Sequence, residues 1–248
     1  MEKDRRIAVL IDADNVSVKY IKYILEEISN HGNPTVKRIY GDWTRPELGS
    51  WKNILLEFSI TPIQQYGYTT GKNATDAALI IDAMDILYSK NVDAFCIVSS
   101  DSDFTRLAAR LREAGMFVVG MGERKTPKPF IAACEMFKYL EVLAKIPEVT
   151  RTETHKSDKN KEKVGSGFAD RKVLSRVIST IVSDCSDEEG WAYLGEVGTR
   201  LNKRYPEFDV RNYGQQKLTP LIQSLKMFEI QSQKTSNPRV TQYYIRNK

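Results

Sequence analysis

The stretch RIAVLIDADN, at residues 6–15, joins a short apolar run to a group of acids. An uninterrupted run of this length is typical of a strand that is buried on both faces. A second stretch of the same kind, AFCIVSSDSD, occupies residues 94–103. Carboxylates directly after strand ends usually face an open crevice in an α/β protein. The two stretches therefore predict a parallel sheet with acids along one edge.

Strand and helix patterns alternate through the first 145 residues. Short β-rich runs predict strands at 7–11, 36–40, 61–65, 94–98 and 117–121. Helical patterns lie between them, at 18–29, 47–58, 75–89 and 103–114. Repeated βα units predict an α/β domain, a parallel sheet with helices on both faces. We expect the Rossmann-like strand order 3-2-1-4-5, which makes strands one and four neighbours.

The composition changes at residues 150–167, which are charged, polar and free of aromatic side chains, as in a solvated linker. Helical patterns follow at 170–184, 193–204 and 213–225, and strand patterns at 228–231 and 240–245. Three helices and a β-ribbon predict a small winged-helix domain. The expected domains are residues 1–146 and 169–248, separated by a flexible charged linker at 147–168.

The overall composition, with 41% hydrophobic and 28% charged residues, is that of a soluble globular protein. No apolar run is long enough to cross a bilayer, and the N-terminal apolar run is too short for a signal peptide. Three widely spaced cysteines favour a reducing cytoplasm, with Cys96 as a small core residue. Only two histidines are present, which argues against zinc and against histidine-based catalysis.

Charge is distributed unevenly along the chain. Residues 1–150 hold 19 Lys and Arg against 20 Asp and Glu, whereas residues 151–248 hold 18 against 12. A basic C-terminal part beside an acidic N-terminal site fits a polyanion that is held at one place and modified at another. A basic surface that serves only solubility is the alternative.

The predicted topology brings acids from distant parts of the chain together. Asp12 follows strand one, and Asp101 and Asp103 follow strand four, whose carboxyl end borders the same crevice. Asp76, in the first turn of the third helix, can approach that crevice from the side. Carboxylates around one point repel each other unless a cation lies between them, and an oxygen-only set favours Mg²⁺ or Mn²⁺.

Each acid also has a structural explanation, because aspartates commonly cap helices and turns. Asp14 could be a ligand or could cap the helix that begins near Ser17. Asn15 is expected to orient groups beside Asp12. Asp82 lies on another part of the third helix from Asp76 and is expected to be an interface charge or a support for the site.

Four ordered motifs resemble the NYN domain of LabA-like bacterial proteins, a relative of the PIN ribonucleases. The resemblance spans about residues 5–142 and rests on residues 7–15, 71–76 (GKNATD), 82–85 (DAMD) and 98–104 (VSSDSDF). It implies a Rossmann-like fold and metal-dependent hydrolysis of RNA phosphodiesters. By position, it also implies that the metal-site acids are Asp12, Asp76, Asp101 and Asp103, with Asn15 adjacent.

The C-terminal part is similar to the OST-HTH/LOTUS winged helix over about residues 170–246. The motifs are WAYLGEVG at 191–198 and RNYG at 211–214. This resemblance implies binding of RNA or of a protein partner, and the chain also allows a homodimer. Pro220 departs from the pattern, either as a first-turn residue of a shortened third helix or as a kink in a longer one.

Loops on the crevice side carry residues that are candidates for contact with single-stranded RNA. Cationic side chains can bind the phosphates, and an aromatic ring can stack on the bases. They are Trp43, Arg45, Lys72, Ser100, Arg124 and Lys125. The expected function is that of a Mg²⁺- or Mn²⁺-dependent endoribonuclease. The main alternative is an RNA-binding regulatory adaptor whose metal site is weak or unused. A phosphatase of the haloacid dehalogenase type fits less well, because Asn15 and Val16 replace the threonine and glycine-rich context expected after its DxD.

Overall fold

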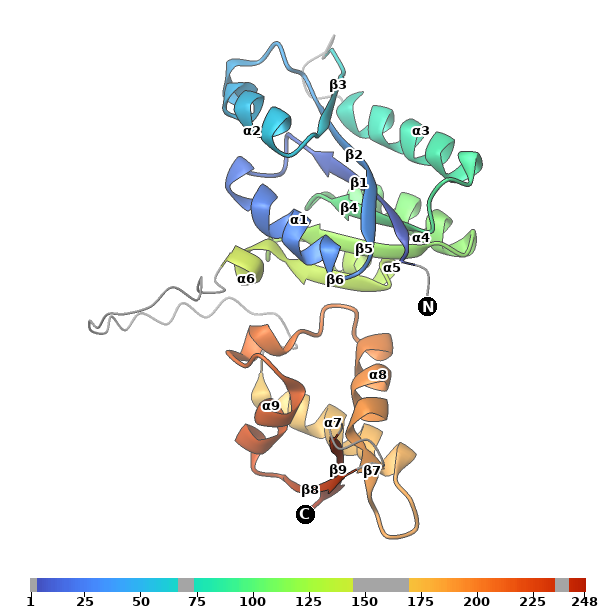
Figure 1. Ribbon diagram of the computed structural model, residues 1–248, viewed down its shortest axis with the longest axis vertical. Coiled ribbons are helices and arrows are strands. Elements are labelled where there is room, and N and C mark those ends of the chain that lie inside the picture. The colour runs from blue at the N-terminus through green and yellow to red at the C-terminus, as the bar shows by residue number, and fades with distance from the viewer. Residues whose placement is uncertain (1–3, 67–73, 145–169, 235–240) are drawn as a thin grey trace, which may run out of the picture. The chain divides into compact units, whose positions relative to one another are not determined.

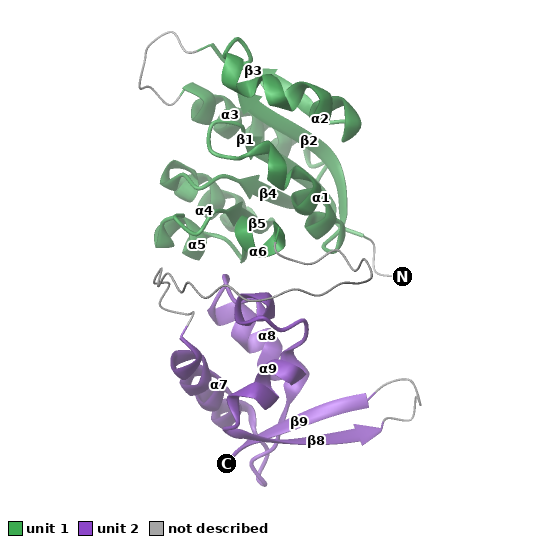
Figure 2. Ribbon diagram, turned by 90° about the vertical axis from the view of Figure 1, so that its left-hand side faces the viewer, with its two compact units in different colours: residues 1–146 green, residues 147–248 purple. Residues whose placement is uncertain are grey.

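The chain divides into two compact units, Met1–Ile146 and Pro147–Lys248 (Figure 2). The computed structural model describes residues 4–66, 74–144, 170–234 and 241–248. The predicted linker at 147–168 therefore lies outside the described residues. Each unit has its own hydrophobic core and is described separately below.

Six parallel strands form the sheet of the first unit, in the order β3-β2-β1-β4-β5-β6 (Figure 1). They are β1 (Arg6–Asp12), β2 (Asn33–Gly41), β3 (Thr61–Gln64), β4 (Ala94–Val98), β5 (Phe117–Gly122) and β6 (Met136–Tyr139). The predicted parallel α/β sheet and the order of its first five strands are confirmed. The pairing of β1 with β4 places the ends of these two strands side by side.

Helices cover both faces of this sheet (Figure 1). The helices of the first unit are α1 (Ile21–Ser29), α2 (Trp51–Glu57), α3 (Ala74–Ser89), α4 (Thr105–Glu113), α5 (Lys128–Ala133) and α6 (Leu140–Ala144). Short 3₁₀ turns precede three of them, namely η1 (Val18–Tyr20), η2 (Pro46–Ser50) and η3 (Ser102–Phe104). Every residue of β4 is buried, which explains its continuous apolar sequence.

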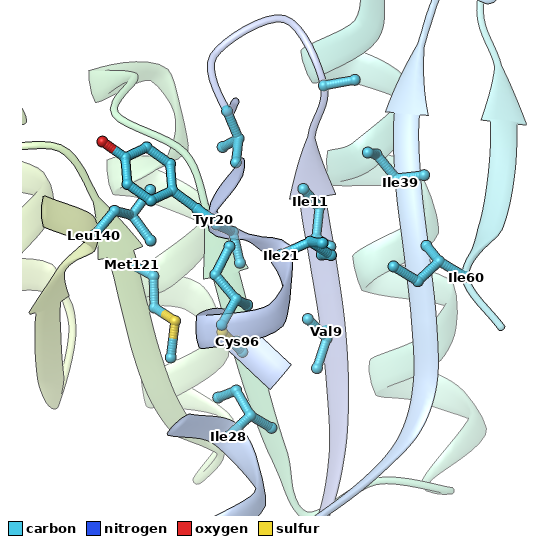
Figure 3. Close-up of a cluster of buried hydrophobic side chains, with 14 of the residues drawn as sticks. Val9, Ile11, Tyr20, Ile21, Ile28, Ile39, Ile60, Cys96, Met121 and Leu140 are labelled. Atoms are coloured by element: carbon cyan, nitrogen blue, oxygen red, sulfur yellow. The ribbon is translucent and has the colours of Figure 1, made fainter. Parts of the chain in front are cut away.

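The alternating side chains of each strand supply two separate cores. On the face covered by α1, α2 and α6, Val9, Ile11 and Cys96 pack against helix residues such as Ile21 and Ile28 (Figure 3). On the other face, α3, α4 and α5 pack against Leu10, Phe95 and their neighbours. Cys96 is fully buried, so its predicted place in the core is confirmed.

The sixth strand and its flanking helices were not predicted from the sequence. β6 has only four residues and includes Lys138, while α5 and α6 span six and five residues. Elements this short carry too few residues to show a periodic pattern. β6 exists because it pairs in parallel with the edge of β5, from Val119–Met136 to Gly122–Tyr139, and this pairing is a tertiary contact.

The second unit packs three helices against a small antiparallel sheet. The helices are α7 (Arg171–Cys185), α8 (Leu194–Arg204) and α9 (Leu218–Leu225), with the 3₁₀ turn η4 (Val210–Tyr213). The sheet has the order β7-β9-β8, formed by β7 (Ala192–Tyr193), β9 (Thr241–Asn247) and β8 (Phe228–Lys234). Leu174, Ile178, Val197 and Ile245 are fully buried in its core. The predicted helices and ribbon are present, and β7 adds a third strand that was not predicted.

Pro220 lies in the first turn of α9, which begins at Leu218 and has eight residues. A proline is tolerated there because the first N–H groups of a helix have no partner inside the helix. Of the two alternatives, the shortened helix is therefore the one that the chain adopts. Among the residues that the structure describes, no helix is long and apolar enough to cross a membrane.

Substitution of Gly120 tests how tightly β5 packs against Cys134 and β6. An added Cβ would lie 2.6 Å from both Cys134 Sγ and Phe137 Cδ2. We expect Gly120→Ala to lower the free energy of unfolding of the first unit by about 1–3 kcal/mol, the usual cost of overpacking. Gly49→Ala is the control, because nothing lies within 4 Å of its added Cβ. Urea denaturation of both variants measures the difference, and equal midpoints would contradict the packing argument.

Candidate metal centre

Three acids from two segments meet at the carboxyl edge of the large sheet. One carboxylate oxygen from each of Asp76, Asp101 and Asp103 can be chosen so that all three atoms lie within 4.8 Å of one another. Asp76 lies in the first turn of α3 and is buried, whereas Asp101 is half-buried and Asp103 is exposed. Such a set of hard oxygen donors fits a divalent cation such as Mg²⁺ or Mn²⁺.

The loop after β4 has a defined conformation that places Asp101 and Asp103. Asp101 is the N-cap of η3, and its Oδ1 accepts a hydrogen bond of 2.9 Å from the backbone N–H of Asp103. This Asx-type bond fixes two acids that are two residues apart. Asp101 therefore caps a helix, as expected for such aspartates, and it also belongs to the acid cluster.

Asp12 ends β1 and is fully buried, but it is not one of the three clustered acids among the described residues. Its Oδ2 accepts hydrogen bonds from Asn15 Nδ2 at 2.7 Å and from Ser99 Oγ at 2.8 Å. Its Oδ1 accepts a third, of 3.0 Å, from the backbone N–H of Asp14. Three donors compensate much of the cost of burying this carboxylate.

Ser99 links the two strand ends, a role that the sequence alone did not assign. Its hydroxyl donates to Asp12 and accepts a hydrogen bond of 3.0 Å from the backbone N–H of Asp101. The serine is fully buried at the end of β4. A hydroxyl that both donates and accepts can connect a carboxylate to a backbone amide. Its position directly before the acidic loop was the only sequence signal for this role.

Burial and like charges raise the pKa of two carboxyl groups at this edge, Asp76 and Asp12. The pKa of Asp76 is raised from 3.8 to about 6, first by burial and then by the negative charges of Asp12, Asp101 and Asp103. Burial also raises the pKa of Asp12, although the hydrogen bonds from Ser99 and Asn15 oppose this effect. A bound cation would relieve the repulsion that raises the pKa of Asp76.

Several predicted contact residues lie on the loops after β4 and β5. Ser100 Oγ accepts a 2.9 Å hydrogen bond from the backbone N–H of Glu123. Lys125 Nζ lies 3.1 Å from Glu123 Oε2 and is 62% exposed. The guanidinium of Arg124 lies over the ring of Tyr139, 5.4 Å from its centroid. The bond between Ser100 and Glu123 joins the two loops, which follow neighbouring strands, whereas Lys125 and Arg124 contact residues of the loop after β5 and of β6.

Two further predicted contact residues, Trp43 and Arg45, follow β2. The indole N–H of Trp43 donates to the carbonyl of Ile63 at 3.0 Å, and its partly buried ring packs against the core. Arg45 is 56% exposed, with its Nη1 3.7 Å from Asp14 Oδ1. Lys72 lies outside the described residues. Trp43 therefore has a structural role, whereas Arg45 presents most of its guanidinium to solvent.

The remaining acids separate into different surroundings. Asp82 lies on α3 and contacts Arg38 and the Tyr40 hydroxyl of β2, so it ties this helix to the sheet. Asp14 is exposed and faces Arg45, and Ser17, not Asp14, is the N-cap of η1. Asp85 is exposed on α3.

The fold and its acidic edge define a Rossmann-like α/β protein with a second, winged-helix unit. Residues 6–141 match the NYN domain, and residues 170–240 match the OST-HTH/LOTUS domain, as the motifs predicted. The first match covers more than half of the chain, so this protein belongs to the NYN domain family. The two domains support a nuclease with RNA binding, and NYN and PIN-like nucleases generally use divalent metals.

Two solved structures are similar to parts of the chain. A protein of unknown function from Vibrio parahaemolyticus is 20% identical, with a TM-score of 0.47, and the match covers 55% of this chain and 93% of that one. An uncharacterized protein from Nitrosomonas europaea is 26% identical, with a TM-score of 0.28, and the match covers 42% of this chain and 92% of that one. Neither likeness bears on function. No curated protein matches the sequence.

The raised pKa of Asp76 predicts a pH-dependent stability. The folded state binds this proton more tightly than the unfolded state does, because the folded pKa of about 6 exceeds the ordinary 3.8. Asp76 therefore destabilises the metal-free fold as the pH rises through this window. We expect Asp76→Asn in EDTA to raise the unfolding midpoint by a few degrees at pH 7.5, equivalent to about 1 kcal/mol after solvent screening.

Thermal unfolding from pH 4 to pH 8 measures this effect. The difference between Asp76→Asn and wild type should be largest above about pH 6 and should vanish towards pH 4, where the unfolded carboxyl is also protonated. Asp85→Asn is the control, because it removes the same charge from an exposed position on the same helix. A midpoint for Asp76→Asn that is unchanged at pH 7.5 would show that the acids do not strain the fold.

Proposed function

We propose that this protein is a divalent-metal-dependent endoribonuclease that cleaves single-stranded RNA, with a C-terminal domain that holds RNA. The observation that carries the proposal is the cluster of Asp76, Asp101 and Asp103, whose oxygens lie within 4.8 Å of one another at the carboxyl edge of an NYN domain. Three acids this close are costly unless they serve a cation. The OST-HTH/LOTUS match and the excess of basic residues in the C-terminal part support RNA as the ligand.

In this proposal, Asp76, Asp101 and Asp103 hold Mg²⁺ or Mn²⁺. When bound, such a cation neutralises charge on the phosphoryl group and lowers the pKa of water. Asp12 adds negative charge behind the three acids and positions both Asn15 and Ser99 through hydrogen bonds. Ser99 in turn holds the backbone of Asp101 in place. The carboxylates must be ionised to hold a cation, so the pKa of about 6 for Asp76 would weaken cation binding below about pH 6.

The exposed cations around the acids are the proposed RNA contacts. Arg45, Arg124 and Lys125 lie on the loops after β2 and β5, at the same edge of the sheet as the acids. The long side chains of Arg124 and Lys125 can reach phosphates of a strand that crosses the site, and such contacts contribute affinity without base specificity. Lys72 remains part of this proposal by its sequence position alone.

Substitution of the acids tests catalysis separately from binding. We expect full-length protein to shorten a labelled single-stranded RNA with Mg²⁺ or Mn²⁺ but not with EDTA. Asp101→Asn and Asp12→Asn should lower the cleavage rate by about 10²-fold or more, because each removes a charge needed at the site. RNA binding, measured by fluorescence anisotropy, should remain close to that of wild type.

Asp85→Asn is the matched control, since Asp85 is exposed on α3, and it should cleave RNA as wild type does. If the protein binds RNA but never shortens it with either metal, and all variants behave identically, the proposed catalytic function is wrong. The protein would then be an RNA-binding adaptor.

A further inference from the structure

A cleft of about 650 Å³ lies between the loop after β1 and the loop after β2. Its lining comes from two segments, residues 13–18 and residues 45–51. The apolar lining side chains Val16, Leu48 and Trp51 are each less than a tenth exposed, so this wall is part of the hydrophobic core. The volume falls inside the range of about 300–1,000 Å³ that is typical of sites for small ligands.

The cleft adjoins the candidate metal centre through Asp14. Asp14 lines the cleft, and its backbone N–H donates to Asp12 Oδ1 at 3.0 Å. The charge of Asp14 also reaches the acid cluster, where it contributes to the raised pKa of Asp76. The cleft therefore lies beside Asp12 at the carboxyl edge of the sheet, the edge that also carries the clustered acids.

The charged groups that line the cleft are the carboxylates of Asp14 and Glu47 and the guanidinium of Arg45, which lies beside Asp14. Arg45 Nη1 lies 3.7 Å from Asp14 Oδ1, and Arg45 Nε lies 4.0 Å from Asp42 Oδ2, distances too long for hydrogen bonds. Ser17 and Ser50 also line the cleft, and neither hydroxyl makes a capping hydrogen bond to the helix that it precedes. Donors and acceptors thus line a cavity that also has an apolar wall.

We propose that this cleft binds one nucleotide of the RNA beside the cleaved phosphodiester and that it selects guanine. The proposal rests on the proposed ribonuclease function, and it adds a base preference to it. Guanine presents two adjacent donors, N1–H and N2–H, next to two acceptors, O6 and N7. The Asp14 carboxylate matches the donors, and the neighbouring Arg45 guanidinium matches the acceptors. Adenine, cytosine and uracil lack two adjacent donors, so they leave Asp14 unsatisfied.

Binding of mononucleotides to the full-length protein tests the cleft without any cleavage. Titration calorimetry with 5′-GMP, 5′-AMP, 5′-CMP and 5′-UMP should give the tightest binding for GMP. We expect Asp14→Asn and Arg45→Ala each to weaken GMP binding by about tenfold or more, as for the loss of a paired base contact. Asp85→Asn and Arg106→Ala are the matched controls, because both residues are exposed on α3 and α4, and they should bind GMP as wild type does.

Cleavage of labelled RNAs that contain a single guanosine separates this inference from the proposed function. Wild type should cut next to that guanosine, and Asp14→Asn should lose the preference while still cutting. If no RNA is cut but GMP binding depends on Asp14 and Arg45, the nucleotide site stands and the ribonuclease function falls. If RNA is cut while GMP binds no better than the other nucleotides, or both variants bind GMP as wild type does, the guanine site is wrong.

Discussion

The parallel pairing of β1 with β4 is the contact on which the site depends. Residues 7–11 lie opposite residues 94–98 in an unbroken register, so both strands end at the same height in the sheet. Asp12 follows one strand, and Ser99 follows the other, close enough for a hydrogen bond of 2.8 Å. Strands eighty residues apart in sequence share this edge because the winding of the sheet reverses between them. The crevice is therefore a consequence of topology, not of any single loop.

The two buried aspartates at this crevice differ in how the free-energy cost of burying a carboxylate is offset. Asp12 is buried but receives three hydrogen bonds, whereas Asp76 is buried close to other acids and has a pKa of about 6. The first arrangement is stable without any ion, and the second is costly at neutral pH. Asp82 shows how α3 is held in place, because its contacts with Arg38 and Tyr40 anchor the helix that carries Asp76.

Most of the large sheet could be predicted from the sequence because its central strands are long, apolar and bounded by turns. β4 is buried along its whole length, and such runs identify strands without any tertiary information. β6 could not be predicted in this way, since four residues that include a lysine carry no period of their own. The acids of the site were found by their positions after strands and by the motifs that contain them. Ser99 was not, because a serine before a helix is most often an ordinary cap.

The sequence by itself determined the first five strands of the large sheet, the residues that follow them, and the joining of an NYN domain to an OST-HTH/LOTUS domain. These features depend on local patterns of apolar and polar residues, which can be recognised in consecutive residues of the sequence. The tertiary structure alone decided that Asp76, Asp101 and Asp103 approach within 4.8 Å while Asp12 is hydrogen-bonded behind them. It also decided that Asp14 and Arg45 lie side by side in the lining of one cleft. Distances between side chains from separate elements depend on how those elements pack. Local sequence patterns do not reveal such distances.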